Sequence, residues 1–119
     1  MKKKLLIIED DENTRELLLM EFVDSGYEVL AVKSAFIGIE AFKENNIDLV
    51  LLDMKLPGMD GFEAIEKIMV IDKGLPVIIH SAYGHFRDNY LSWKATDYVV
   101  KSGNLDPLKE SVRKHLNRN

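Results

Sequence analysis

Five short apolar runs are spaced along this chain, and each one stops at a polar or charged residue. We place them within residues 5–8, 27–32, 48–53, 77–80 and 98–100. Their unbroken apolar character, clearest in Leu49-Val50-Leu51-Leu52, is typical of strands in a parallel sheet that is covered on both faces. The chain must therefore place helices on both sides of one sheet.

Segments with helix signals separate the apolar runs. The first helix is expected to begin at a cap on Asp11 or Asn13 and to end at Ser25-Gly26. The second is expected over 34–43 with Ser34 as its cap, the third from 61 or 62 to about 70, and the fourth over 86–93. The last is expected to be capped by Asn104 or Asp106. In the first, Leu17, Leu18, Phe22 and Val23 recur at helical spacing. Gly38 is expected to weaken its helix by about 1 kcal/mol relative to alanine. The alternation predicts one α/β domain over residues 1–119, a doubly wound sandwich with a five-stranded parallel sheet.

Composition excludes several classes of protein. The chain has 119 residues, a net charge of −4 and no cysteine. Disulfides, zinc–thiolate sites and cysteine nucleophiles are thereby excluded, and there is no basic footprint for nucleic acid. The apolar run after Met1-Lys2-Lys3-Lys4 is too short for a signal peptide or a membrane span. We expect a cytoplasmic protein without direct nucleic-acid contact or membrane insertion.

Acidic side chains follow two of the expected strands. Glu9 and Asp10 come after the first, and Asp53 ends the third. These strands are neighbours in a doubly wound sheet, and their carboxyl ends share the edge where such folds carry out their chemistry. Carboxylates a few ångströms apart repel each other by about 4 kcal/mol per pair at an effective dielectric constant of about 20. The trio therefore predicts a Mg²⁺ site, with Mn²⁺ possible, although a single acid at a strand end is more often a solvated side chain.

A hydroxyl and an ammonium are expected at the same edge, because Ser81 follows the fourth strand and Lys101 follows the fifth. Taken singly, Ser81 is more often a turn residue and Lys101 a surface lysine. Together with a metal, they are suited to an anion with charge on three oxygens, and a phosphoryl group fits that description.

Four separated motifs now resemble the receiver domain of two-component response regulators from end to end. They are Ile7-Ile8-Glu9-Asp10-Asp11, the stretch from Leu51 through Asp53-Met54-Lys55-Leu56-Pro57-Gly58-Met59-Asp60-Gly61, Ser81-Ala82-Tyr83 and Asp97-Tyr98-Val99-Val100-Lys101. The stretch from Asp53 to Gly61 and the following Met69-Val70-Ile71-Asp72 are most similar to stand-alone receivers of the sporulation phosphorelay type. The resemblance implies a flavodoxin-like strand order 2-1-3-4-5.

The resemblance implies a role for each site residue. Asp53 would be the phosphoacceptor, attacking a phosphohistidine of a kinase. Asp10, Asp53 and the backbone carbonyl of Lys55 would bind Mg²⁺ directly, and Glu9 would bind it through water. The family's acid pair is assigned to Glu9-Asp10 by counting back from Arg15, which leaves Asp11 as an extra acid or helix cap. Ser81 would be the switch hydroxyl, Lys101 its salt-bridging partner, and Tyr98 the switch aromatic.

One departure concerns Lys101-Ser102, where the family usually has Lys-Pro with a cis peptide. A cis bond before a residue other than proline costs about 3–4 kcal/mol, so a trans bond is expected. Lys55 and Tyr83, each two residues after Asp53 or Ser81, would flank the phosphoryl group. They predict a long-lived phosphoaspartate if they screen it from water; the alternative is that both are surface residues.

Because the chain ends at Asn119 without a helix-turn-helix, output is expected to pass through protein binding. The expected partners are a sensor histidine kinase or histidine phosphotransfer domain and a downstream protein target. Docking in the family implies the following candidates: Asn13, Thr14, Leu17, Leu18, Pro57, Gly103, Asn104 and Leu105. Leu18 could equally be a core residue.

Two alternatives remain open. A phosphohydrolase with an aspartate nucleophile would need a second acid at the position of Lys55, and it would need more chain for a substrate cap. A degenerate receiver would serve only as a binding module, although every site position here carries a competent side chain. Neither accounts for the residues as well as a signalling phosphoacceptor does.

Overall fold

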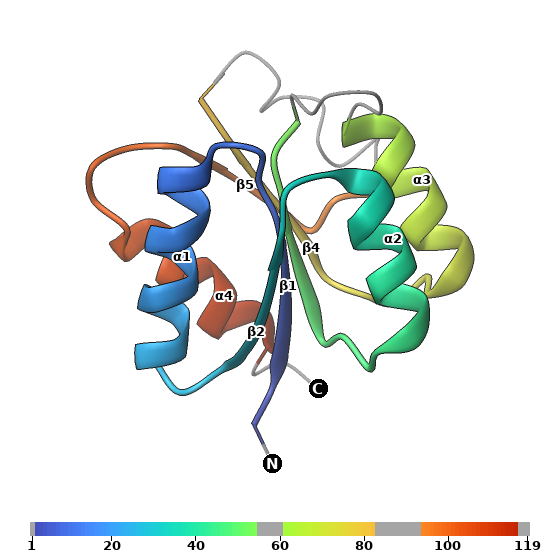
Figure 1. The fold of residues 1–119 in the computed structure, drawn as a ribbon, viewed down its shortest axis with the longest axis horizontal. Helices are drawn as coiled ribbons and strands as arrows, with labels where there is room; N and C mark the ends of the chain where they lie inside the picture. The colour runs from blue at the N-terminus through green and yellow to red at the C-terminus, as the bar shows by residue number, and fades with distance from the viewer. Residues whose placement is uncertain (1, 55–60, 83–93, 117–119) are drawn as a thin grey trace.

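The computed structural model describes residues 2–54, 61–82 and 94–116. In chain order, the elements are β1 (Lys4–Ile8), α1 (Glu12–Asp24), β2 (Glu28–Val32), α2 (Ala35–Glu44), β3 (Leu49–Leu52), α3 (Gly61–Ile71), β4 (Val77–Ser81), β5 (Asp97–Val100) and α4 (Asp106–Leu116). Figure 1 shows the strands running side by side between two groups of helices. The helix expected over residues 86–93 falls outside the described residues, so α4 corresponds to the last predicted helix.

The five strands form one parallel sheet in the order β2-β1-β3-β4-β5, which confirms the predicted fold and strand order. Ile8 pairs with Leu52, and Ser81 pairs with Val100. All strands point the same way, so the residues that follow β1, β3, β4 and β5 meet at one edge of the sheet. This register brings the predicted site residues together.

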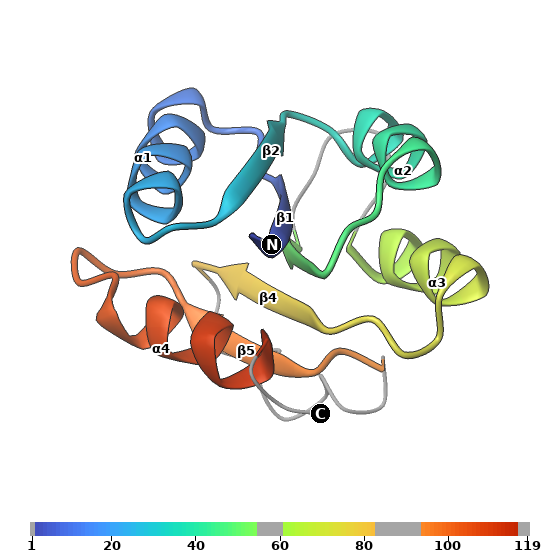
Figure 2. The same ribbon diagram turned by 90° about the horizontal axis from the view of Figure 1, so that it is seen from below.

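Among the described residues, α1 and α4 cover one face of the sheet and α2 and α3 cover the other (Figure 2). The side chains of β1 alternate between them: Leu5 and Ile7 pack in a core with Leu18, Phe22, Leu108 and Val112, whereas Leu6 and Ile8 pack in a second core with Ile39, Ile65 and Ile68. Burial on both faces explains why the strands read as continuous apolar runs.

Helix ends follow the predicted signals. Asp11 caps α1, its Oδ2 accepting a hydrogen bond of 2.9 Å from the Thr14 amide, and Ser34 caps α2 by accepting from Ile37. Gly26, which follows the end of α1, has a φ of +98°, a value that favours glycine. Among the described residues, no helix is long and apolar enough to cross a membrane.

Gly38 has a packing reason that the sequence did not reveal. A Cβ atom on it would lie 2.6 Å from Cδ1 of Ile8, a buried side chain of β1. Glycine therefore lets α2 approach the sheet closely, which offsets the helix propensity it lacks.

Candidate functional site

Three carboxylates converge at the carboxyl edge of the sheet. Glu9 and Asp10 follow β1, Asp53 follows β3, and one ligand oxygen from each lies within 4.8 Å of the others. The parallel ladder holds them there, because the Asp53 amide donates to the Ile8 carbonyl at 3.1 Å and the Glu9 amide to the Val32 carbonyl at 3.0 Å. Glu9 is 2% exposed and Asp53 is 7% exposed, whereas Asp10 faces solvent.

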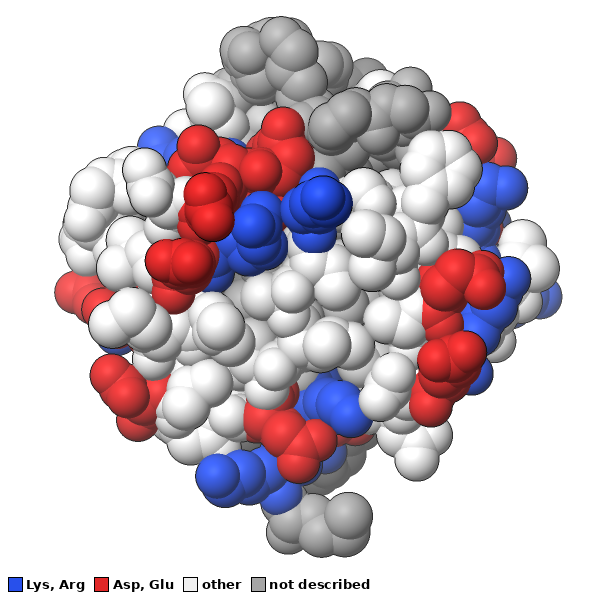
Figure 3. Space-filling model, viewed as in Figure 1, with Lys and Arg blue, Asp and Glu red and all other residues white. Residues whose placement is uncertain are grey.

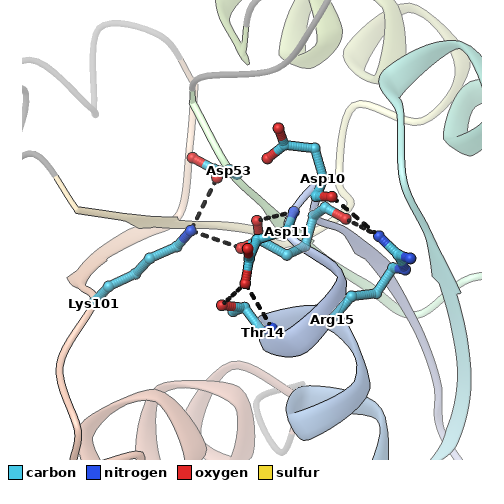
Figure 4. Close-up of polar contacts among 7 residues, drawn as sticks. Asp10, Asp11, Thr14, Arg15, Asp53 and Lys101 are labelled. Carbon is cyan, nitrogen blue, oxygen red and sulfur yellow. Dashed lines mark hydrogen bonds and ion pairs between the residues drawn. The ribbon is translucent and has the colours of Figure 1, made fainter.

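Lys101 connects two of these acids (Figure 4). Its Nζ lies 2.7 Å from Oε1 of Glu9 and 3.0 Å from Oδ2 of Asp53. Burial disfavours the charged form of the lysine, but hydrogen bonds to Glu9 and Asp53 outweigh burial and raise the pKa of Lys101. Burial also raises the pKa of Glu9, and its hydrogen bonds with Lys101 and the Asp11 amide offset this only in part. Among the described residues, one ammonium is thus paired with two members of a group of three carboxylates.

The donor set fits Mg²⁺. All three side chains offer carboxylate oxygens, the ligands that a hard divalent cation prefers. The negative charge exceeds what Lys101 neutralises, so a divalent cation would relieve the remaining repulsion. Figure 3 shows Asp and Glu side chains gathered near the end of the molecule where the strands have their carboxyl ends.

Ser81 and Tyr98 lie on the two neighbouring strands β4 and β5. Ser81 ends β4 and is fully buried, and its carbonyl accepts a hydrogen bond of 2.8 Å from the Lys101 amide. Tyr98, opposite Ile79 in the β4–β5 ladder, is buried in the core shared with α2 and α3. The Lys101-Ser102 peptide is trans, as expected. Ser81 and Lys101 therefore reach the same edge as the acids, with the aromatic on the neighbouring strand.

Arg15 is a residue whose contacts the sequence did not predict. Its Nη1 donates to the backbone carbonyls of Glu9 at 3.0 Å and of Asp10 at 3.3 Å (Figure 4). From the sequence alone, Arg15 serves only as the reference position that assigns the family's acid pair to Glu9-Asp10. An arginine one helical turn after the cap, Asp11, is the signal that could have suggested such a contact.

The predicted docking residues divide by exposure. Asn13, Gly103 and Asn104 are exposed and Leu17 is 47% exposed, but Leu18 is 1% exposed and packs in the core. Of the two roles left open for Leu18, its burial favours that of a core residue, because the rotation of α1 that buries Phe22 also turns Leu18 inward. Thr14 and Leu105 are half-buried. Val23, which shares the predicted spacing, is exposed together with Met20. Lys55, Pro57 and Tyr83 lie outside the described residues.

Comparison with known protein families decides the class of the protein. The model of the response regulator receiver domain matches residues 5–113. The chain belongs to this family. Sporulation initiation phosphotransferase F of Bacillus subtilis is 35% identical over 118 residues, which cover 98% of this chain and 95% of that protein. The chain spans about half the length of several transcriptional regulators that it also resembles, such as MtrA of Mycolicibacterium smegmatis.

Solved receiver structures have the same fold. Response regulator TrrA of Thermotoga maritima, solved in complex with Mg²⁺ and beryllium fluoride, is 40% identical with a TM-score of 0.89, covering 95% of this chain and 98% of its own. TrrA has also been solved in complex with the histidine kinase ThkA. A CheY-like receiver domain of Methanospirillum hungatei is 28% identical with a TM-score of 0.92, over 98% of this chain and 95% of that one.

Proposed function

We propose that this receiver domain takes a phosphoryl group onto Asp53 in a Mg²⁺-dependent reaction and signals through the resulting change in its surface. The observation that carries the proposal is the group formed by Glu9, Asp10, Asp53 and Lys101, which combines three converging carboxylates with a bridging ammonium. Such a group suits phosphoryl transfer, where positioning and charge neutralisation do most of the work.

Glu9, Asp10 and Asp53 would hold the metal, together with the backbone carbonyl of Lys55 as the family pattern implies; Mn²⁺ would bind through the same oxygens. When bound, the ion neutralises negative charge on the phosphoryl oxygens. Asp10 is the exposed member of the group and Glu9 the buried one. This difference supports direct contact through Asp10 and contact through water from Glu9.

The chemical step transfers a phosphoryl group between two nucleophiles. An oxygen of the Asp53 carboxylate attacks the phosphorus of a phosphohistidine, the phosphorus–nitrogen bond breaks, and the imidazole leaves with the electron pair and takes up a proton. Lys101, held 3.0 Å from Oδ2 of Asp53, keeps the carboxylate in place and stays near the charge that arrives. The domain would promote its own phosphorylation and dephosphorylation in this way.

Ser81 and Tyr98 would convert the new charge into a structural change. The Ser81 side chain, at the carboxyl end of β4, would be drawn onto the phosphoryl oxygens by a charge-assisted hydrogen bond. Movement at Ser81 would reach Tyr98 on the neighbouring strand, whose inward position in this structure is one of the two arrangements that the switch requires.

A sensor histidine kinase or histidine phosphotransfer domain would supply the phosphoryl group, and a downstream protein would read it. The structure of TrrA with its kinase supports a kinase partner. On this chain, docking would use Asn13 and Leu17 of α1 with Gly103 and Asn104 before α4, and Pro57 as the family implies. The exposed side chains of Met20 and Val23 extend the α1 surface. Lys55 and Tyr83 would set the lifetime of the phosphoaspartate.

Incubation with acetyl phosphate and Mg²⁺, followed by intact mass measurement, tests the proposal. We expect a gain of one phosphoryl group that is lost with EDTA and in Asp53→Asn. Asp48→Asn is the matched control, because Asp48 flanks the other end of β3, where its carboxylate accepts a hydrogen bond from the Lys4 amide. A gain that survives Asp53→Asn, or no gain in the wild type, would contradict the proposal.

A further inference from the structure

One arginine contacts the backbone of both acids that follow β1. A single nitrogen of Arg15, Nη1, donates to the Glu9 carbonyl at 3.0 Å and to the Asp10 carbonyl at 3.3 Å. In Figure 4 the guanidinium reaches from α1 to the loop, on the side away from Lys101. The contact therefore joins α1 to the two residues that supply the first carboxylates of the metal group.

The loop between β1 and α1, residues 9–11, is also held by hydrogen bonds at the end that leads into α1. The Asp11 carboxylate accepts hydrogen bonds from the Thr14 amide at 2.9 Å and the Thr14 hydroxyl at 2.7 Å, and the Asp11 amide donates to Oε2 of Glu9 at 3.1 Å. Helix α1 itself is anchored to the sheet through Leu18 and Phe22. Because the helix is rigid and anchored, Arg15 can transmit its position to the Glu9 and Asp10 backbone.

The choice of acceptor is informative. Within the described part of the chain, the hydrogen bonds of Arg15 go to backbone carbonyls, and its nitrogens form no ion pair with a carboxylate. The carboxylate oxygens of Glu9 and Asp10 are thus not occupied by the guanidinium. As a bare charge, Arg15 would repel a divalent cation a few ångströms away. A favourable effect on metal binding can come only from holding the loop.

We propose that Arg15 is a positioning residue for the divalent cation, which fixes the loop so that Glu9 and Asp10 face Asp53 before the metal arrives. The inference rests on the metal binding of the proposed function. Groups that orient metal ligands without touching the metal typically change affinity by about 10- to 100-fold when they are removed. For Arg15→Ala we expect Mg²⁺ affinity to fall about tenfold.

The test is calorimetric titration of Mg²⁺ into the full chain, for wild type, Arg15→Ala, Arg15→Lys and Arg113→Ala. Arg113 is the matched control, since its guanidinium pairs with Glu110 on the exposed side of α4 and does not touch the loop. Arg15→Lys keeps the charge but loses the planar donor, and we expect it to bind Mg²⁺ more weakly than wild type and more tightly than Arg15→Ala. Arg113→Ala should bind as wild type does.

The sign of the effect separates the explanations. Tighter Mg²⁺ binding by Arg15→Ala would show that charge repulsion dominates, and equal binding would show that the contact only supports the fold; either result overturns the inference while leaving the proposed function intact. A wild type that binds no Mg²⁺ would overturn both. In metal-free protein, hydrogen exchange of the Asp11 amide should be faster in Arg15→Ala than in Arg113→Ala, with unchanged circular dichroism, and equal exchange rates would count against positioning.

Discussion

The two ends of strand β5 carry groups of charged and polar residues that differ in their ratio of hydrogen-bond donors to carboxylates. At its beginning, the Asp97 carboxylate accepts hydrogen bonds from the Ser111 hydroxyl at 2.5 Å and from the Tyr98 amide at 2.8 Å, and Nε2 of His115 lies 3.5 Å away. One carboxylate there has several donors. After its end, Lys101 faces Glu9 and Asp53, with Asp10 close by, so one ammonium serves several carboxylates.

This difference teaches how a structural cluster can be told from a functional one. The Asp97 carboxylate accepts hydrogen bonds from donors of its own chain and joins β5 to α4, as a structural contact should. Counted over the described residues, the Lys101 group has an excess of negative charge at a sheet edge, which costs stability unless a cation binds. Charge imbalance, rather than the number of ionisable residues, indicates where a ligand binds.

Each end also has a buried histidine. Nδ1 of both His80 and His115 is buried without a hydrogen-bond partner among the described residues. His115 faces the Asp97 carboxylate, whereas burial, together with the positive charge of Lys101, lowers the pKa of His80 to about 4. The Lys101 ammonium therefore adds to the effect of burial on His80, against the smaller opposite effect of the Asp53 charge.

The largest effect is expected from Lys101→Met. Removing the ammonium breaks its ion pairs with the buried Glu9 and Asp53, and breaking a buried ion pair in this way typically costs about 3–5 kcal/mol. Urea unfolding in EDTA at neutral pH should show this loss. Mg²⁺ should raise the free energy of unfolding more in the variant than in wild type, because the ion takes over neutralisation of the carboxylates.

A loss in Lys101→Met that Mg²⁺ leaves unchanged would break the comparison. It would mean that the group at the carboxyl edge, like the Asp97 group, has no excess negative charge that a cation could neutralise. The measurement needs no phosphodonor, so it tests the charge excess separately from phosphoryl transfer.

The second effect concerns His80→Met. A pKa near 4 in the folded state and 6.5 in the unfolded state means that the unfolded chain binds more protons between these values. The stability that neutral His80 preserves is complete above pH 6.5 and is lost as the pH falls toward 4. Between about pH 7 and pH 5, wild type should lose about 2 kcal/mol more than the variant.

Urea unfolding of both proteins at these pH values gives the difference directly. Subtracting the result for His80→Met from that for wild type removes the contribution of Glu9, which both proteins contain. The raised pKa of Glu9 changes stability in the opposite direction as the pH falls. If both proteins lost the same stability, the field of Lys101 and the burial of His80 would not have the effect inferred from their geometry.

Sequence reasoning reached the fold and the acids for a physical reason. Continuous apolar runs report strands buried on both faces, and in a parallel sheet a residue that follows a strand must lie at the carboxyl edge. Glu9, Asp53, Ser81 and Lys101 all follow strands, so their approximate meeting place was set by topology. Proximity that is set by the pairing of strands can therefore be predicted from the sequence.

Contacts that depend on the rotation and register of helices were not predictable. Leu17 and Leu18 are neighbours with the same side chain, and only the packing of α1 decides that Leu18 is buried. Arg15 reaches the loop carbonyls, and Ser111 and His115 reach Asp97, because of where α1 and α4 settle on the sheet. Gly38 reads as a weak point in α2 until its approach to Ile8 is seen.

A smaller effect is expected at the Asp97 end of β5. Ser111→Ala removes the hydroxyl that donates to Asp97, which costs about 1.5 kcal/mol because the acceptor is charged and only partly reached by water. Unlike the loss in Lys101→Met, this one should be the same with Mg²⁺ and with EDTA in urea unfolding. Recovery of Ser111→Ala by Mg²⁺ would mean that the two ends of β5 are not independent.

The smallest effect should come from the ion pair between Lys109 of α4 and Glu21 of α1, which lies outside both groups. Their atoms are 2.7 Å apart, but both side chains are 36% exposed, so water screens the charges. A double-mutant cycle with Glu21→Gln and Lys109→Met should give a weak favourable coupling at low salt, falling toward zero near about 1 M salt. A coupling as large as that of Lys101, or one that persists in salt, would show that distance alone governs these pairs. The comparison instead requires burial: the same separation of 2.7 Å between Lys101 and Glu9 has a large effect because Glu9 is removed from water.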